Sequence, residues 1–163
     1  EQECTPTERW ADFYVHQRVL PFARSAHEVG NLDARGVEVV TRACDALLEE
    51  DEDAPLARIH GDLWAGNLLF SPEGPRFIDP AAHGGHPLTD IAMLELFGAP
   101  HFDAIVDGYV RAGGVLGSVE TADAWRARIP IHQLHPLAVH ATTHDPSYAS
   151  ALVRAAHDTL DAM

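Results

Sequence analysis

The sequence contains no lysine and only two cysteines, and its basic residues are few. All 11 basic residues are arginine, and they stand against 25 acidic residues, which gives a formal net charge of −14. Long-range repulsion disfavours nonspecific binding to nucleic acid or to an anionic membrane surface, so a small-molecule or cationic partner fits better. Cys4 and Cys44 match neither a disulfide framework nor a zinc motif, and we expect both to be reduced thiols.

Long apolar segments are also missing. No apolar run approaches the ~20 residues that span a bilayer, and no charged and then apolar leader opens the chain. We therefore expect a soluble, cytoplasmic protein with no membrane partner. The chain has 163 residues, of which 46% are hydrophobic, and this is enough for a core of its own, so we expect a single domain over residues 1–163.

Most of the chain shows apolar residues at helical spacing, interrupted by one short stretch with strand and turn signals. That stretch contains "LLF" and "RFID" around "SPEGP", which predicts a β-hairpin over 68–79. The spacing elsewhere predicts helices over about 7–26, with Thr7 as N-cap and a bend or end near Pro21, and over 32–50, 91–98 (capped by Thr89 or Asp90), 101–112, 121–143 and 146–160. The predicted fold is α+β and mainly helical, a helical bundle with one small β-hairpin.

Polar side chains gather around this hairpin, in and after the stretch "IHGDLWAGNLLF" (59–70). Asp62 lies in a loop, Asn67 comes just before one strand, and Asp79 ends the partner strand. Because a hairpin brings its two ends together, Asn67 and Asp79 should be neighbours, with Asp62 approaching from the preceding loop. A carboxylate and an amide oxygen suit Mg²⁺, and a further carboxylate can accept the proton of a hydroxyl. The pattern predicts phosphoryl transfer from a nucleoside triphosphate.

Each of these residues also has a plainer interpretation. Asp and Asn commonly cap loops and hairpin ends, and Trp64 could be a buried aromatic residue that anchors the loop rather than a substrate contact. The 11 histidines invite a transition-metal interpretation, but they form no recognised zinc pattern with cysteine or carboxylate residues, even where pairs could meet, as among His83, His86, His132, His135 and His140.

The stretch "HGDLWAGNLLF", followed by "FIDPAAHGGHPLTDIAMLELFG" and by "RIPIHQLHPLAVH", resembles the C-terminal lobe of the fructosamine (ketosamine) kinases. These are relatives of the aminoglycoside phosphotransferases within the protein-kinase-like fold, and the resemblance covers most of the chain. It implies an ATP-dependent and Mg²⁺-dependent kinase. The acceptor would be a hydroxyl of a ketosamine, either a small molecule or a protein-bound fructosamine, or of a related aminated small molecule.

The resemblance also implies roles for individual residues. Asp62 would be the catalytic base, and Asn67 and Asp79 would bind magnesium and, through it, the nucleotide. Asp90 and His60 would support the catalytic loop, Asp90 by accepting backbone hydrogen bonds. Two further positions would contact the substrate, Trp64 and His86.

A kinase of this fold also needs an N-terminal lobe, with a lysine that pairs with the phosphates. This chain has no lysine, and its first predicted helix begins within ten residues of the start, which leaves no room for a preceding sheet. We therefore expect the chain to be a C-terminal lobe without its N-terminal partner, inactive alone and able to self-associate through the exposed lobe face. The alternative is a noncatalytic truncated lobe that acts as a binding or dimerisation module.

Overall fold

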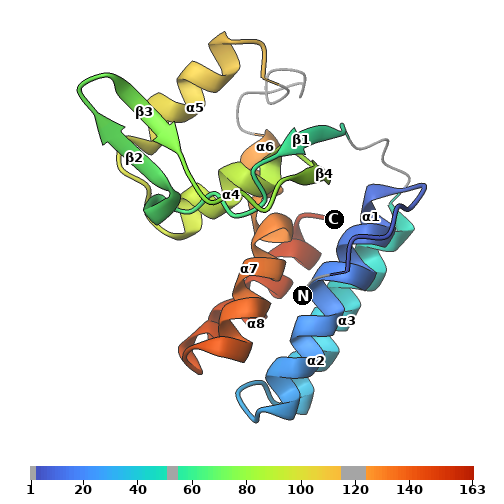
Figure 1. Cartoon of the computed structure of the whole chain (residues 1–163). Coiled ribbons are helices and arrows are strands. Elements are labelled where there is room, and N and C mark those ends of the chain that lie inside the picture. Colours follow the sequence, from blue (N-terminus) through green and yellow to red (C-terminus); the bar gives the residue numbers. More distant parts are fainter. Residues whose placement is uncertain (1–2, 51–54, 115–123) are drawn as a thin grey trace. The chain divides into compact units, whose positions relative to one another are not determined.

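The computed structural model describes residues 3–50, 55–114 and 124–163. These residues form two compact units, one built from 3–50 and 130–163 and the other from 55–114 and 124–129 (Figure 1). The single domain expected over residues 1–163 stays a prediction. The secondary structure agrees with the predicted α+β, mainly helical class, because the described residues are mainly helical with two small sheets.

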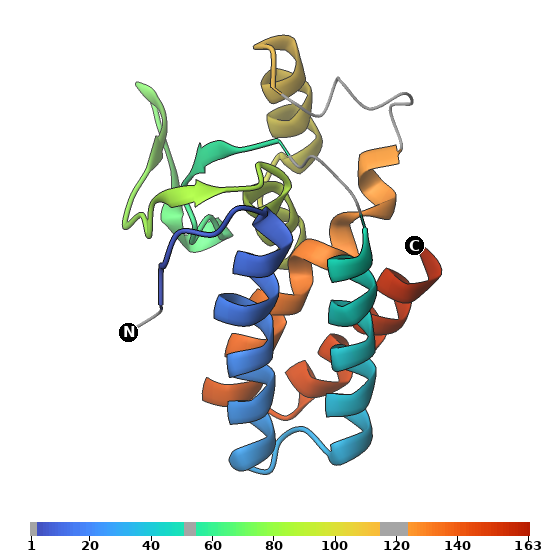
Figure 2. The ribbon, with the colours of Figure 1, turned by 90° about the vertical axis from the view of Figure 1, so that its right-hand side faces the viewer.

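The regular elements of the first unit, among its described residues, are all helices. Its elements are α1 (Trp10–Tyr14), the π-helical turn η1 (Val15–Val19), α2 (Leu20–Glu28), α3 (Ala34–Glu49), most of α7 (Ile129–Thr143) and α8 (Ser147–Asp161). Helices α2 and α3 lie side by side, joined by a short turn, and α3 packs against α8 (Figure 2). The predicted helices over 32–50 and 146–160 are confirmed, and Asp33 caps α3 by accepting a hydrogen bond from the Gly36 N–H at 2.7 Å.

Tyr14 lies at the centre of this unit and is only 2% exposed. Its hydroxyl donates to the Ile131 carbonyl at 2.8 Å and accepts from the His135 backbone N–H at 3.2 Å, so α1 and α7 are joined by a buried polar link. Burial raises the pKa of the Tyr14 hydroxyl far above its ordinary value. Both cysteines are free thiols, as predicted, and burial raises the pKa of Cys44 to about 12, while Cys4 is exposed.

The predicted start of the first helix is wrong, and of the bend or end predicted near Pro21 the end is excluded. Thr7 is not the N-cap, because the helix starts after Arg9 and the Thr7 hydroxyl donates instead to the Arg9 carbonyl at 2.8 Å. The helix does not end at Pro21 either. The π-helical turn η1 carries it from α1 into α2, where Pro21 occupies the first turn. A proline ring crowds the carbonyl four residues before it, and the wider π turn relieves that crowding.

The second unit combines helices with short antiparallel strands. The predicted hairpin is confirmed as β2 (Leu68–Ser71) and β3 (Gly74–Phe77). A second pair, β1 (Ala57–Ile59) with β4 (His83–Gly85), was not predicted, because each strand has three residues and β4 contains two glycines, which leaves no alternating pattern to recognise. The other elements are the 3₁₀ turn η2 (Ala65–Asn67), α4 (Leu88–Leu96), α5 (Phe102–Arg111) and α6 (Ala124–Ala127).

Helix α4 (Leu88–Leu96) starts and ends earlier than the predicted range 91–98, but Gly98 terminates it as predicted. The expected caps, Thr89 and Asp90, both lie inside the first turn, and the N-cap is Pro87. At the other end, Gly98 adopts φ 64°, and the N–H groups of Gly98 and Ala99 bond to carbonyls of the last helical turn. This is a Schellman motif, in which glycine accepts the left-handed conformation without strain.

The predicted helix over 121–143 is divided in the described residues. Residues 121–123 lie outside them, and the remainder forms α6 and α7, separated at Arg128. Pro130 follows in the first turn of α7, a position where its missing N–H is tolerated, and Pro136 lies within the helix. None of the helices in the described ranges is long and apolar enough to cross a membrane. The cytoplasmic location stays a prediction.

Candidate active site

Two short sheets fix the ends of the predicted catalytic loop. Strand β1 ends at Ile59, which pairs with His83 of β4, and strand β2 begins at Leu68, which pairs with Phe77 of β3. Residues 60–67 connect the two sheets and contain four of the seven predicted site residues. Backbone hydrogen bonds therefore determine where this loop begins and ends.

Asp62 and Asn67 meet within the loop. Nδ2 of Asn67 donates to Oδ2 of Asp62 at 3.1 Å and to the Asp62 backbone carbonyl at 2.9 Å. Asn67 is buried and Asp62 is half-buried. Because the amide nitrogen bonds to these two oxygens, the amide oxygen of Asn67 remains available as an acceptor or a metal ligand.

Asp79 and Asn67 both lie at the open end of the hairpin, opposite its turn. The link is through the backbone, since the N–H of Ile78 donates to the Asn67 carbonyl at 3.1 Å. Asp79 itself is exposed and adopts φ 52°, a left-handed conformation that is unfavourable for a residue with a side chain. Strained conformations of this kind concentrate at functional sites. The hairpin thus brings the three predicted residues into one region, as its topology predicted.

Asp90, from the first turn of α4, holds the start of the loop. Its Oδ2 accepts the N–H of His60 at 2.7 Å, and its Oδ1 accepts the N–H of Gly61 at 3.0 Å. Burial raises the pKa of the Asp90 carboxyl above its ordinary value, and the two backbone hydrogen bonds oppose that rise. These are the backbone contacts expected of Asp90.

His60 connects the loop to the hairpin. Its Nε2 lies 2.9 Å from the Ile78 carbonyl, and its Nδ1 accepts the Asp62 backbone N–H at 3.3 Å. In these contacts Nε2 donates to the carbonyl and Nδ1 accepts from the backbone N–H. The imidazole therefore spans from the predicted base to the residue that precedes Asp79.

Gly61 allows the loop to pass close to its neighbours. It adopts φ 80°, and a Cβ at this position would overlap the Ala81 carbonyl and approach Nδ1 of His83 to 2.9 Å. Only glycine satisfies both constraints without strain.

Trp64 projects from the middle of the loop and is 44% exposed. It is therefore not a fully buried anchor, and the predicted substrate contact stays a prediction. Its ring meets Phe97 edge to face at 6.5 Å between centroids. Gly66 was not among the predicted site residues, although a Cβ there would collide with this indole. No spacing in the sequence marks that contact, because it depends on the rotamer of Trp64.

His86 is only 4% exposed. Its Nδ1 accepts the Leu88 N–H at 3.1 Å, and its carbonyl accepts the Thr89 N–H at 3.0 Å, so it helps to start α4. Burial, with a smaller effect of the nearby Arg128 guanidinium, lowers the His86 pKa from its ordinary value near 6.5 to about 4. The structure thus gives His86 a structural task, and its predicted substrate contact stays a prediction.

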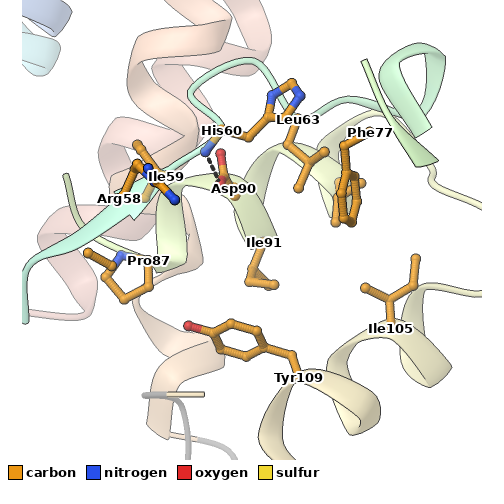
Figure 3. A pocket seen from close by; sticks show the side chains of 12 residues that line it. Arg58, Ile59, His60, Leu63, Phe77, Pro87, Asp90, Ile91, Ile105 and Tyr109 are labelled. Carbon is orange, nitrogen blue, oxygen red and sulfur yellow. Dashed lines mark hydrogen bonds between the residues drawn. The ribbon is translucent and has the colours of Figure 1, made fainter. Parts of the chain in front are cut away.

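An apolar cavity of about 260 Å³ lies between the start of the loop and helices α4 and α5 (Figure 3). His60 and Asp90 form part of its wall, and none of Asp62, Asn67 and Asp79 lines it. The remaining wall is mostly apolar and includes Leu63, Phe77, Ile91, Leu94, Ile105 and Tyr109. The cavity is distinct from the polar face where the three predicted residues gather.

The donor set fits magnesium better than a transition metal. Among the residues that the structure describes, no three His, Cys, Asp or Glu side chains come together as a metal site. The loop offers the amide oxygen of Asn67, and the end of the hairpin offers the exposed carboxylate of Asp79. These are hard ligands and few in number. Mg²⁺ keeps several waters and is usually bound through one or two protein oxygens together with substrate phosphates.

Comparison with known proteins identifies the family. The family model for fructosamine kinase matches residues 1–162. The chain belongs to the fructosamine kinase family. The resemblance inferred from the "HGDLWAGNLLF" and "FIDPAAHGGHPLTDIAMLELFG" stretches is therefore confirmed.

Individual relatives agree with this assignment. The chain is 32% identical over 148 residues to the "Probable ketoamine kinase" of Enterococcus faecium, covering 88% of this chain and 50% of that protein. A crystal structure assigned as a fructosamine-3-kinase from Thermobifida fusca is 44% identical, with a TM-score of 0.85 over 98% of this chain and 54% of that one. A Haemophilus somnus structure, 19% identical with a TM-score of 0.70, shares the fold. The chain spans about half the length of these family members.

The lowered pKa of His86 predicts a loss of stability in mild acid. The folded protein keeps this imidazole neutral down to about pH 4, whereas the unfolded chain protonates it below about 6.5. Stability is therefore unaffected above pH 6.5 and falls as the pH drops from 6.5 to 4, by up to about 3 kcal/mol. We expect His86→Asn, whose amide oxygen can still accept the Leu88 N–H, to remove this part of the pH dependence. Chemical unfolding of both proteins at pH 7 and pH 4.5 checks it, and parallel losses would contradict the assignment.

Proposed function

We propose that the chain carries the catalytic loop of an ATP-dependent kinase that phosphorylates a hydroxyl of a ketosamine. The acceptor is a small ketosamine or a fructosamine on a protein. The main support is the contact of Asp62 with Asn67 beside Asp79, on a loop held by Asp90, in a chain of the fructosamine kinase family. Family membership supports the reaction class, and the geometry supports the roles of the individual residues.

Asp62 acts as the base in this proposal. Its carboxylate is already oriented by the Asn67 amide at 3.1 Å, so it needs no rearrangement to accept a hydrogen bond from the acceptor hydroxyl. Its half-buried position leaves it reachable from solvent. As the γ-phosphoryl group passes from ATP to the hydroxyl oxygen and ADP leaves, the hydroxyl proton passes to this carboxylate.

Asn67 and Asp79 hold the nucleotide end of the site. The Asn67 amide oxygen and the Asp79 carboxylate would bind Mg²⁺ together with the phosphates of ATP, and the ion would neutralise the charge that develops on them. Asn67 is fixed by the two contacts of its amide nitrogen with Asp62. One side chain thereby couples the position of the metal ligand to the position of the base.

The charge of the chain favours an acceptor that carries an amine. With a formal net charge of −14, the chain attracts a cation at long range and repels an anion. A ketosamine contains a protonatable amine next to its sugar. The anionic nucleotide, by contrast, needs its Mg²⁺ counter-ion to reduce its repulsion from this acidic chain.

We further propose that the described fold is a C-terminal lobe and that the remainder of the full-length protein supplies an N-terminal lobe. The chain spans about half of its relatives, and it contains no lysine to pair with the nucleotide phosphates. Exposed apolar side chains on the hairpin would then face that lobe, and in the isolated chain they would favour self-association. These side chains are Leu69, Phe70 and Phe77, which are 47%, 49% and 60% exposed.

Asp62→Asn in the full-length protein should lower kcat by ~10²-fold or more, because the amide keeps the shape of the side chain but accepts no proton. Nucleotide affinity should stay unchanged, since Asp62 does not bind the metal in this proposal. Steady-state kinetics with a ketosamine acceptor measure the first quantity, and nucleotide titration measures the second. A variant that retains near-normal kcat would remove Asp62 from the mechanism.

Asp79→Asn should weaken Mg²⁺-nucleotide binding and turnover together, because it removes one negative charge from the ligands of the ion. The thermal shift that Mg²⁺-ATP produces in the full-length protein reports this loss. Asp107→Asn, an exposed aspartate on α5, is the matched control and should leave the shift unchanged. An undiminished shift in Asp79→Asn would contradict the metal-ligand role.

The 163-residue chain should fold when produced alone but form no product from ATP and a ketosamine. Phosphoryl transfer depends on positioning and charge neutralisation, and the proposed N-terminal lobe would supply part of both. Product formation and sedimentation should be measured on this chain and on the full-length protein in parallel. Turnover by the short chain at roughly 1 per second or faster, the ordinary range for kinases, would show that no further lobe is needed.

A further inference from the structure

The position of the Trp64 indole depends on a residue that has no side chain. A Cβ placed on Gly66 would come within 2.7 Å of Cζ3 of Trp64 and closer still to Cζ2 and Cη2. Gly66 lies in the 3₁₀ turn η2, and its φ lies outside the left-handed range. Its backbone conformation is therefore one that other residues can also adopt. What requires glycine at this position is the ring that lies against it.

Other contacts fix the same residue from different directions. The Trp64 N–H donates to the Asp62 carbonyl at 3.1 Å, and the Trp64 carbonyl accepts the Asn67 N–H at 2.9 Å. The ring itself meets Phe97 edge to face, with an interplanar angle of 76°. The indole is thus held between η2 and the end of α4, while 44% of the residue, two positions after Asp62 in the chain, stays exposed.

We propose that Gly66 is a positioning residue, which fixes the Trp64 indole as a preformed aromatic surface for the acceptor beside Asp62. An indole face attracts the ammonium group of an aminated sugar and covers the apolar side of its ring. A surface that is ordered before binding loses little conformational entropy when the acceptor arrives. The acceptor part of this inference rests on the proposed function, whereas the placement of the indole does not.

Gly66→Ala in the full-length protein tests the placement. The protein should fold, because the overlap is with the far end of a side chain that can move. The indole should turn away from η2 and become more accessible to acrylamide. Trp10 and Trp125 are 8% and 4% exposed, so subtracting the fluorescence quenching of a Trp64→Phe protein isolates the signal of Trp64.

The kinetic measurement tests the consequence. Gly66→Ala should raise KM for the ketosamine roughly tenfold and leave KM for ATP unchanged, because only the acceptor surface moves. In a Trp64→Ala background, the same substitution should have no further effect on the acceptor KM, since no indole remains to be displaced. Gly84→Ala is the matched control, because a Cβ there meets nothing within 4 Å.

Two outcomes would overturn the proposal: unchanged quenching in Gly66→Ala, or a rise in the acceptor KM that is equally large with and without Trp64. An equal rise would mean that Gly66 acts on the loop and not through the indole. If the wild-type protein phosphorylates no ketosamine, the proposed function fails and the acceptor role of Gly66 fails with it. The quenching measurement then decides the placement of the indole separately.

Discussion

The organisation of the second unit depends on one carboxylate that accepts two consecutive backbone N–H groups. Asp90 binds the N–H groups of His60 and Gly61, the two residues that precede the proposed base. The carboxylate lies against an apolar cavity, where an unpaired N–H or an unpaired charge would be costly. Its place in the first turn of α4 adds a favourable interaction with the helix dipole. The loop is therefore held by a helix, and the helix is itself fixed by His86 at its start and a Schellman motif at its end.

A chain of hydrogen bonds, most of them to backbone groups, connects Asp90 to the other residues of the proposed site. Asp90 fixes His60, and the imidazole of His60 joins the Asp62 N–H to the Ile78 carbonyl. The Ile78 N–H in turn binds the Asn67 carbonyl, which closes the connection from the loop to the end of the hairpin. None of these backbone links involves the side chain of Asp62 or Asp79, so substitutions at these two positions should leave the backbone frame in place. Asn67 differs, because its amide also donates to the Asp62 backbone carbonyl.

The parts of this structure that the sequence predicts are those set by local pattern. The hairpin follows from two apolar runs around a proline and glycine turn, and its topology alone brings Asn67 near Asp79. Two of the parts that were wrong or missed depend on contacts distant in sequence. Thr89 and Asp90 are good caps by intrinsic preference, but the Asp90 carboxylate bonds to the loop 29 and 30 residues earlier. Strands β1 and β4 form for a similar reason, since neither has a pattern of its own and each exists through pairing with the other.

Electrostatic repulsion accounts for the presence of one neutral amide beside two carboxylates in the proposed site. A nucleotide triphosphate is an anion, and a third carboxylate at position 67 would repel it wherever the counter-ion did not fully compensate. Asn67 offers an oxygen ligand without that charge, and its nitrogen satisfies the Asp62 carboxylate at the same time. The negative charge that remains is placed where it is useful in the proposed reaction, at Asp79 toward the metal and at Asp62 toward a hydroxyl on a cationic acceptor. In a chain of formal net charge −14, a neutral ligand between two carboxylates would let the proposed site bind both an anionic donor and a cationic acceptor.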